Sequence, residues 1–204
     1  MEKVSFFFGR HGECALRKQT GFTLIELMVT LSVLAILLAI AVPNYITFIQ
    51  NARLTGQAND LVTALNYARS EAIKRGVRTT VCSLGATNSS CAGSNTWDTG
   101  WLVFVDCTNV GVRDTGNCPD WDANGAPDDE PVLVVRPPLE NGNTLRTVNL
   151  PDVTYQNSGF SGNMGTFRLC DIRGVASGRA IVVNPQGRVR TGALINEVPA
   201  LTCP

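Results

Sequence analysis

The hydrophobic pattern of the chain changes twice, and its three parts predict three kinds of structure. Residues 22–42 form the first part, an apolar run in which only Glu26 is charged. At 1.5 Å per residue this run makes a helix about 31 Å long, which is enough to cross a bilayer. The sequence therefore predicts a membrane-spanning helix near the N-terminus.

The second part is amphipathic and continues the helix. Pro43 is expected to kink it, because proline removes a backbone donor and clashes with the preceding turn. In residues 44–76 the apolar side chains recur at helical spacing: Ala58, Leu61, Val62, Leu65, Ala68, Ala72 and Ile73. Arg75-Gly76 has the form of a helix end, a basic last turn followed by a glycine. One helix of about 50 residues results, far longer than is usual in globular proteins.

The third part consists of short β-branched or aromatic runs, separated by clusters of Gly, Pro, Asn and Asp. The predicted strands are residues 78–84, 100–106, 132–136, 145–150, 166–171 and 179–184, with 188–191 as an additional last strand. About 130 residues of this kind suffice for one hydrophobic core. We expect an α+β fold, in which the amphipathic half of the helix packs along a β-rich domain of two antiparallel sheets.

The cysteines indicate an exported domain. Six of the seven lie beyond the apolar run: Cys82, Cys91, Cys107, Cys118, Cys170 and Cys203. An even number in such a domain predicts a disulfide framework, for which many pairings are possible. Closeness along the chain favours Cys82–Cys91, Cys107–Cys118 and Cys170–Cys203. A metal site built from four of these thiolates is the competing interpretation, although the chain has no C-x-x-C pair.

The segment before the apolar run defines the orientation of the helix. Its basic residues place it on the cytoplasmic side: Lys3, Arg10, Arg17 and Lys18. A carboxylate inside a membrane costs about 2.5–3.5 kcal/mol on insertion scales, so Glu26 is a functional candidate. A secretory signal has its cleavage site after the apolar core, whereas the small residue Gly21 lies before it. The alternative is a single-pass membrane protein in which Glu26 has no role.

The stretch Gly21-Phe22-Thr23-Leu24-Ile25-Glu26 closely resembles the type IV prepilin signature. The resemblance implies that a prepilin peptidase cuts after Gly21 and that Phe22 is then N-methylated. It also implies that Glu26 neutralises the N-terminal amine of a neighbouring subunit during assembly. Other pilin subunits are then the expected partners, through the N-terminal helix.

The same resemblance divides the chain into a leader (1–21), a transmembrane or filament-core half of the helix (22–43), an amphipathic half (44–76) and a β-rich globular domain (77–204). The expected location is the bacterial inner membrane, with a single span and a periplasmic domain. From there the subunit would enter an extracellular pilus or a periplasmic pseudopilus.

Removal of the leader argues against an enzyme. The leader contains His11, the only histidine, together with four of the 17 basic and two of the 17 acidic residues. The remaining chain has 13 basic and 15 acidic residues and a net charge of −2. Without histidine it cannot build a Ser-His-Asp site or a His-ligated zinc site. We expect neither catalysis nor a cofactor.

Charge is unevenly distributed over the β-rich part. Residues 98–130 contain eight acids and one base, whereas residues 166–195 contain five arginines and one acid. In a strand, Arg188 and Arg190 project from one face about 7 Å apart, and guanidinium groups suit phosphate oxygens. Arg188 and Arg190 are therefore a candidate phosphate-binding patch, and Arg179 is a further candidate because of its charge and its proximity. Three basic residues at the helix end could extend the patch if the fold brings them near: Lys74, Arg75 and Arg78. The alternative is a solvated strand face or a subunit contact.

The prepilin start, the strand at 100–106 and the segment Gly187-Arg188-Val189-Arg190 together resemble FimT/GspH-like minor pilins and pseudopilins, over nearly the whole chain. In the FimT branch the Gly-Arg-x-Arg segment binds incoming DNA, which implicates Gly187, Arg188 and Arg190. The predicted function is a minor type IV pilin that binds extracellular double-stranded DNA non-specifically during natural transformation. The alternative is a structural minor pilin or type II secretion pseudopilin that primes or caps a filament without binding DNA.

Two further patterns in the sequence have a structural explanation that is favoured over a functional one. Residues 120–125, Asp-Trp-Asp-Ala-Asn-Gly, match the opening of a calcium loop. The twelfth position is Pro131 instead of a glutamate, so an Asx-rich turn is favoured and no metal is expected. Five aromatic residues are possible stacking platforms for bases but are expected to belong to the core: Trp97, Trp101, Phe104, Phe160 and Phe167.

Overall fold

One long helix, α1 (Leu24–Arg75, 52 residues), begins near the predicted cleavage site and ends just before the predicted glycine, Gly76. The computed structural model describes residues 21–87, 89–108, 111–116, 118–121, 123, 125–193 and 203. Thr23 caps the helix, since its hydroxyl oxygen accepts a hydrogen bond from the Glu26 N–H at 3.2 Å. At the other end Gly76 adopts a φ of 69°, the left-handed conformation that terminates helices.

The chain divides into two compact units, Met1–Tyr45 and Ile46–Pro204. In the first unit α1 is exposed and apolar, and within the described residues it is the one helix long and apolar enough to span a membrane, with a mean hydropathy of 2.6 in its most apolar window. Length and composition alone support that reading. Pro43 lies inside α1, which continues through it.

The second unit contains two antiparallel four-stranded sheets. The first has the order β3-β2-β1-β5, with the strands β3 (Val132–Arg136), β2 (Trp101–Val105), β1 (Thr79–Ser83) and β5 (Asp152–Tyr155). The second has the order β4-β6-β7-β8, with β4 (Thr144–Arg146), β6 (Gly165–Cys170), β7 (Arg179–Val183) and β8 (Val189–Ala193). A short 3-10 helix, η1 (Val175–Ser177), precedes β7. This confirms the predicted α+β fold.

The largest departure from the predicted strands lies in residues 144–155. Residues 145–150 were expected to be one strand, but β4 ends at Arg146 and the chain turns before Pro151. The next residues form β5, which the sequence analysis missed. β5 alternates two buried apolar side chains, Val153 and Tyr155, with the polar Asp152 and Thr154. It is only four residues long and follows a proline, so its alternation gave too weak a signal.

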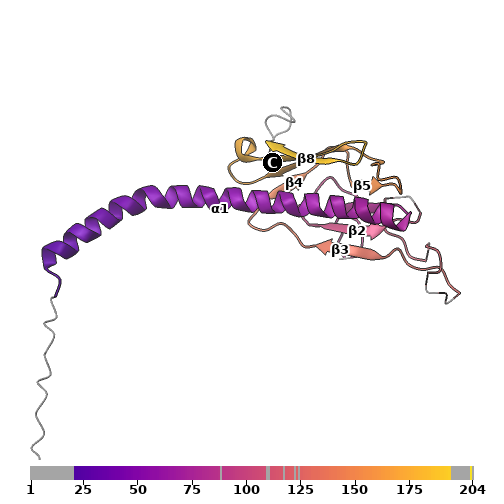
Figure 1. Ribbon diagram of the computed structural model, residues 1–204, viewed down its shortest axis with the longest axis horizontal. Helices are drawn as coiled ribbons and strands as arrows, with labels where there is room; N and C mark the ends of the chain where they lie inside the picture. Colours follow the sequence, from indigo (N-terminus) through magenta and orange to yellow (C-terminus); the bar gives the residue numbers. More distant parts are fainter. Residues whose placement is uncertain are drawn as a thin grey trace, which may run out of the picture. The chain divides into compact units, whose positions relative to one another are not determined.

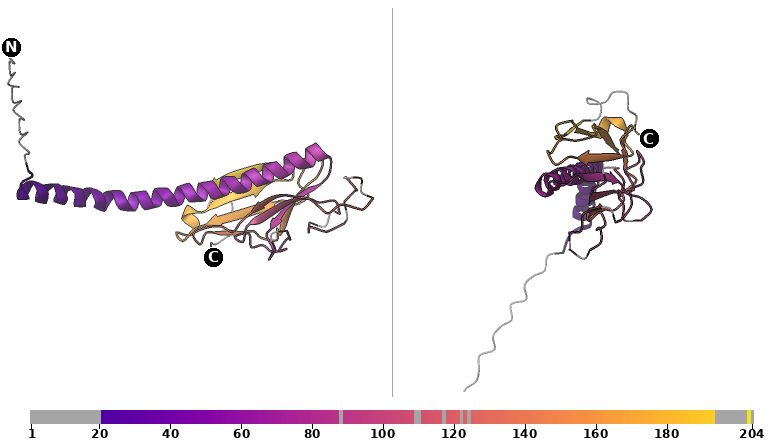
Figure 2. Two further views of the ribbon diagram at one scale, coloured as in Figure 1. Left: turned by 90° about the horizontal axis from the view of Figure 1, so that it is seen from below. Right: turned by 90° about the vertical axis from the view of Figure 1, so that its right-hand side faces the viewer.

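The core is shared by α1 and both sheets. The helix contributes one apolar face, including Leu54, Leu61 and Leu65, to a cluster that also contains Val103 from β2 and Ile181 from β7. In Figures 1 and 2 the sheet with β2 and β3 and the sheet with β4 and β8 lie on opposite sides of this part of α1. Among the described residues, every buried side chain lies in the unit Ile46–Pro204. That unit therefore has a hydrophobic core of its own.

All three predicted disulfides are present: Cys82–Cys91, Cys107–Cys118 and Cys170–Cys203. The first closes a short loop after β1, the second lies in the acidic region, and the third ties residue 203 to the end of β6. The predicted pairing by closeness along the chain is confirmed.

Candidate nucleic-acid interface

The turn at residues 184–188 joins β7 to β8 and begins the Gly-Arg-x-Arg segment. Asn184 closes it twice: its carbonyl oxygen accepts the Gly187 N–H at 2.9 Å, and its side-chain oxygen accepts the Arg188 N–H at 2.8 Å. Gly187 is buried and has a φ of 73°. A Cβ atom there would collide with the carbonyl oxygen of Gly159. Glycine is therefore required both by the backbone conformation and by the close approach of a second turn.

That second turn, residues 156–160, is tied to the first through the helix. Arg69 of α1 donates from Nε to the Gly159 carbonyl at 2.9 Å and from a terminal nitrogen to the Gln186 carbonyl at 3.0 Å. The Ser161 N–H also donates to the Pro185 carbonyl at 3.0 Å. The 156–160 turn, the 184–188 turn and α1 thus form one connected end of the domain.

Arg188 and Arg190 are both exposed, and they project from the outer face of the second sheet. In the β7–β8 register Arg190 lies opposite Val182, and opposing residues of an antiparallel pair share a face. The alternate residues Ile181 and Val183 are buried in the core, so their face is the inner one. By alternation Arg188 lies on the same side as Arg190, as the sequence predicts. Among the described residues neither arginine takes part in an ion pair.

Arg179 does not belong to the same face. It lies opposite Leu169 of β6, a buried residue of the inner face, and opposite Ala193 at the far end of β8. Its register position is three residues from that of Arg190, about 10 Å along the strand. The prediction that Arg179 joins the arginine pair is therefore corrected. Side chains alternate between the two faces of a sheet, so a shift of three positions puts Arg179 on the face opposite to Arg190.

Basic residues at the helix end are partly engaged. Glu71 binds Lys74 at 3.5 Å and Arg75 at 2.6 Å. The hydrogen bond from Arg75 holds the pKa of the Glu71 carboxyl below its usual value. Arg78 is different, since its buried Nε atom has no hydrogen-bond partner among the described residues.

Arg168 is a residue that the sequence analysis did not assign to the interface. It lies opposite Ala180, two register positions from the Val182–Arg190 pair, and hence on the same outer face as Arg190. The alternation of Arg168 with the buried Phe167 and Leu169 is visible in the sequence. The order of strands, which places β6 two strands away from β8, cannot be read from the sequence.

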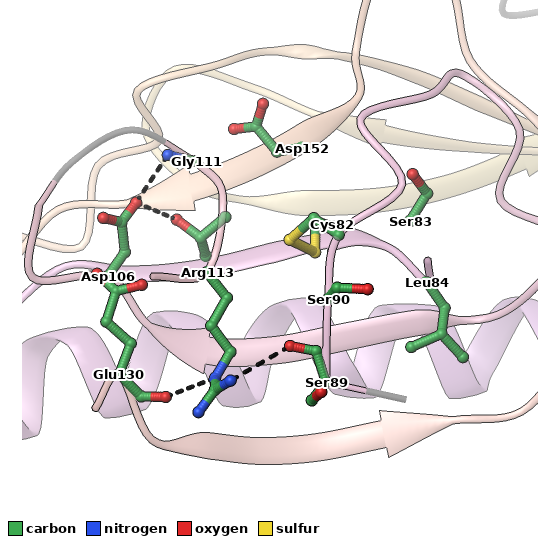
Figure 3. Close-up of a disulfide and its surroundings, with 12 residues drawn as sticks. Cys82, Ser83, Leu84, Ser89, Ser90, Asp106, Gly111, Arg113, Glu130 and Asp152 are labelled. Carbon is green, nitrogen blue, oxygen red and sulfur yellow. Dashed lines mark hydrogen bonds between the residues drawn. A yellow bond between two sulfur atoms is a disulfide. The ribbon is translucent and has the colours of Figure 1, made fainter. Parts of the chain in front are cut away.

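The acidic region forms a separate polar cluster (Figure 3). Asp106 is fully buried and accepts hydrogen bonds from the Thr80 hydroxyl at 2.9 Å and the Gly111 N–H at 3.2 Å. Burial, with a smaller effect of Asp106, raises the pKa of the nearby Asp152 carboxyl. Glu130 is also buried and accepts backbone N–H groups of Cys107 and Asp114, both at 2.8 Å. These carboxylates organise loops, and their hydrogen bonds explain their burial.

The segment that resembles the opening of a calcium loop, residues 120–125, is a hydrogen-bonded turn in its described part, as an Asx-rich turn would be. A carboxylate oxygen of Asp120 accepts the Gly125 N–H, and one of Asp128 accepts the Trp121 N–H, both at 2.7 Å. Asp122 and Asn124 lie outside the described residues. Carboxylates that accept local backbone N–H groups are typical of an Asx-rich turn.

Comparison with known proteins identifies the family. Residues 57–187 match the family described as Type II transport protein GspH, and residues 16–42 match the prokaryotic N-terminal methylation motif. The chain belongs to the GspH family. It is thus a type IV minor pilin or pseudopilin by family, which confirms the predicted membership.

Individual relatives cover less of the chain than the family does. The chain is 35% identical over 80 residues to the type IV major fimbrial protein FimA of Dichelobacter nodosus, covering 38% of this chain and 48% of FimA. It is 39% identical over 61 residues to a fimbrial protein of Pseudomonas aeruginosa, covering 30% of this chain and 39% of that protein. The matches thus span less than half the length of these curated relatives.

The GspH-family fold recurs in a solved structure. The crystal structure of the type IV minor pilin FimU of Pseudomonas aeruginosa has a TM-score of 0.51 with this chain at 18% identity. The match covers 71% of this chain and 92% of FimU. At this identity the likeness shows the shared fold and nothing more.

The assembly residues lie at the start of the described chain. The leader up to Thr20 lies outside the described residues, whereas Gly21, Phe22 and Glu26 are described and exposed. The cleavage, methylation and assembly roles of these three residues remain predictions. The methylation motif and the apolar start of α1 fit membrane anchoring and a pilus or pseudopilus location.

Proposed function

We propose that this GspH-family protein is a minor type IV pilin that binds double-stranded DNA non-specifically for uptake in natural transformation. Arg188 and Arg190 make the principal phosphate contacts, and Gly187 shapes the turn that presents them. The observation that carries the proposal is that both guanidinium groups are exposed, lie on one face and are in no ion pair among the described residues.

The chemistry of the face favours a polyanion. Two arginines about 7 Å apart match the order of separation of successive phosphates on one strand, and each fork can donate two hydrogen bonds to phosphate oxygens. Arg168 on the same outer face extends the path as a third cation. Contacts of this kind carry no base recognition, so binding is expected to be independent of sequence.

The remaining steps of the proposal concern assembly. The leader is removed by a prepilin peptidase after Gly21, and the subunit then waits in the inner membrane with its globular domain in the periplasm. It enters the filament through α1, with other pilin subunits as its partners. No catalytic role or cofactor is part of the proposal.

The exposed apolar half of α1 supports a second candidate, a structural subunit that primes or caps a pilus or secretion pseudopilus without DNA. The two candidates differ in what the arginine face binds. If the protein is a DNA-binding pilin, removing the two arginines abolishes DNA binding. If it is a structural subunit, the same change leaves filament priming unchanged.

The test is a DNA titration of the unit Ile46–Pro204, which retains the whole described core. We expect weak binding of any duplex, and an approximately tenfold loss between about 50 mM and 200 mM salt if two phosphates are contacted. The variant Arg188→Ala/Arg190→Ala should lose this binding, whereas Arg179→Ala, on the opposite face, should retain most of it. Equal binding by the wild type and the double variant would remove the DNA proposal and favour the structural subunit.

A further inference from the structure

We propose that Phe160 is a stacking platform for an unpaired base, so that the interface engages single-stranded segments or frayed ends as well as duplex phosphates. The inference rests on the proposed DNA-binding function and adds a subsite to it. Phe160 is 52% exposed, whereas the four other aromatic residues considered for stacking are fully or almost fully buried: Trp97, Trp101, Phe104 and Phe167.

Phe160 lies where the two turns of the interface meet. Gly159 precedes it and Gly187 precedes Arg188, and the backbones of these glycines are in contact. With about 3.8 Å between consecutive Cα atoms, the Cα atoms of Phe160 and Arg188 lie within about 10 Å of each other. A base stacked on the ring and a phosphate bound by the arginine can therefore belong to neighbouring nucleotides.

The turn that carries Phe160 is held in place. The Gln156 N–H donates to the Phe160 carbonyl at 2.9 Å, and the Gly159 N–H donates to the Gln156 carbonyl at 2.8 Å. Arg69 binds the same turn through the Gly159 carbonyl. An exposed ring on a fixed turn loses little conformational freedom when a ligand stacks on it, which favours binding.

A polar pocket borders the same turn. It has a volume of about 390 Å³ and is lined by Gly76, Val77, Arg78, Gln156 and Asn157. The side-chain amides of Gln156 and Asn157 can pair with base edges, and Arg78 adds a cation to the lining of the same pocket. The 156–160 turn thus combines an aromatic face with hydrogen-bonding groups.

Stacking requires a base whose face is free. In the interior of a duplex both faces of each base are covered by neighbouring bases, so Phe160 can stack only on a single strand, an end or an extruded base. Single-strand binding proteins combine such aromatic faces with a positively charged path. Phe160 lies close to Arg188, and Arg190 follows two residues farther along the chain, so the aromatic face adjoins a positively charged path. This combination favours a nucleic acid over an uncharged ligand.

The test compares three ligands of one length: a short oligothymidylate, the same strand with abasic sites, and a blunt duplex. The protein is the unit Ile46–Pro204, as wild type, Phe160→Ala and Phe160→Leu. The matched control is Trp121→Ala, because Trp121 is another exposed aromatic residue (47%) but lies in the acidic region.

We expect Phe160→Ala to weaken oligothymidylate binding about fivefold or more, the lower end of the effect of one stacked base. Phe160→Leu should behave alike, and Trp121→Ala should bind as the wild type does. Binding to the abasic strand and the duplex should be nearly unchanged by Phe160→Ala. The abasic strand therefore separates stacking from a general loss of folding or charge.

Two other results have distinct meanings. If the wild type binds duplex through the arginines but Phe160→Ala leaves oligothymidylate binding unchanged, the stacking inference is wrong and the proposed function stands. If the wild type binds none of the three ligands, the proposed function fails and this inference fails with it.

Discussion

At the scale of single residues, Gly187 is the position where the fold and the candidate interface depend on each other most directly. We expect Gly187→Ala to destabilise the unit Ile46–Pro204 by about 2 kcal/mol or more. The φ of 73° costs about 1 kcal/mol for alanine, and the collision with the Gly159 carbonyl adds to it. Urea denaturation of the wild type and the variant measures this difference.

Gly76→Ala is the matched control for this prediction. Gly76 has a similar φ of 69° at the end of α1, but a Cβ atom there meets nothing within 4 Å. It should therefore show only the backbone cost of about 1 kcal/mol. If both variants lose the same free energy of unfolding, the close approach of the two turns at Gly187 contributes nothing to stability, and the prediction is wrong.

The positions of single side chains were predicted correctly where they depend only on neighbouring residues in the sequence. The exposure of Arg188 and Arg190 follows from alternation within one strand, which is a local property. The misplacement of Arg179 and the exposure of Phe160 depend on how strands and turns meet across the domain. Sequence spacing alone does not contain that information, since contacts such as Arg69 to Gly159 join residues 90 positions apart.

At the scale of elements, the disulfides cross-link segments of different length. Cys82–Cys91 and Cys170–Cys203 close segments with sequence separations of 9 and 33 residues. Chain entropy predicts that removing each pair by Cys→Ala costs about 3 and about 4 kcal/mol, respectively, because the longer loop loses more freedom on closure. The free energy of unfolding of each double variant tests this.

The comparison must be made under conditions that leave the other two disulfides oxidised. Loss of less than about 1 kcal/mol in the Cys170→Ala/Cys203→Ala variant would contradict the entropic argument. A larger loss in the Cys82→Ala/Cys91→Ala variant would instead indicate a cavity, since Cys82 is fully buried beside Leu102 and Phe104.

The elements themselves were largely predictable. The C-terminal end of α1 is marked by Arg75-Gly76, and most strands have the expected composition. The prediction failed at β4 and β5, where Pro151 separates two short strands that belong to different sheets. A short strand is stabilised by its neighbours more than by its own residues, so its sequence signal is weak.

At the scale of the whole molecule, Glu26 is the residue predicted to control assembly into filaments. It has two possible roles, since it lies at the third position of α1 as well as in the prepilin signature. Its backbone N–H is capped by the Thr23 hydroxyl, and a carboxylate in the first turn also favours the helix through its dipole. A variant that removes the charge but keeps the backbone donor separates the two roles.

We expect Glu26→Gln, in the full-length chain, to be processed to the mature form but not incorporated into filaments. Glutamine retains the size and hydrogen bonding of the side chain but cannot neutralise the N-terminal amine of a neighbouring subunit. Thr23→Ala is the matched control: it removes the cap at a cost of about 1 kcal/mol but keeps the carboxylate, so it should still be incorporated. Immunoblots of sheared filaments and of membranes measure both steps. Normal incorporation of Glu26→Gln, together with a defect in Thr23→Ala, would reverse the interpretation and make helix capping, rather than charge neutralisation, the role of this segment.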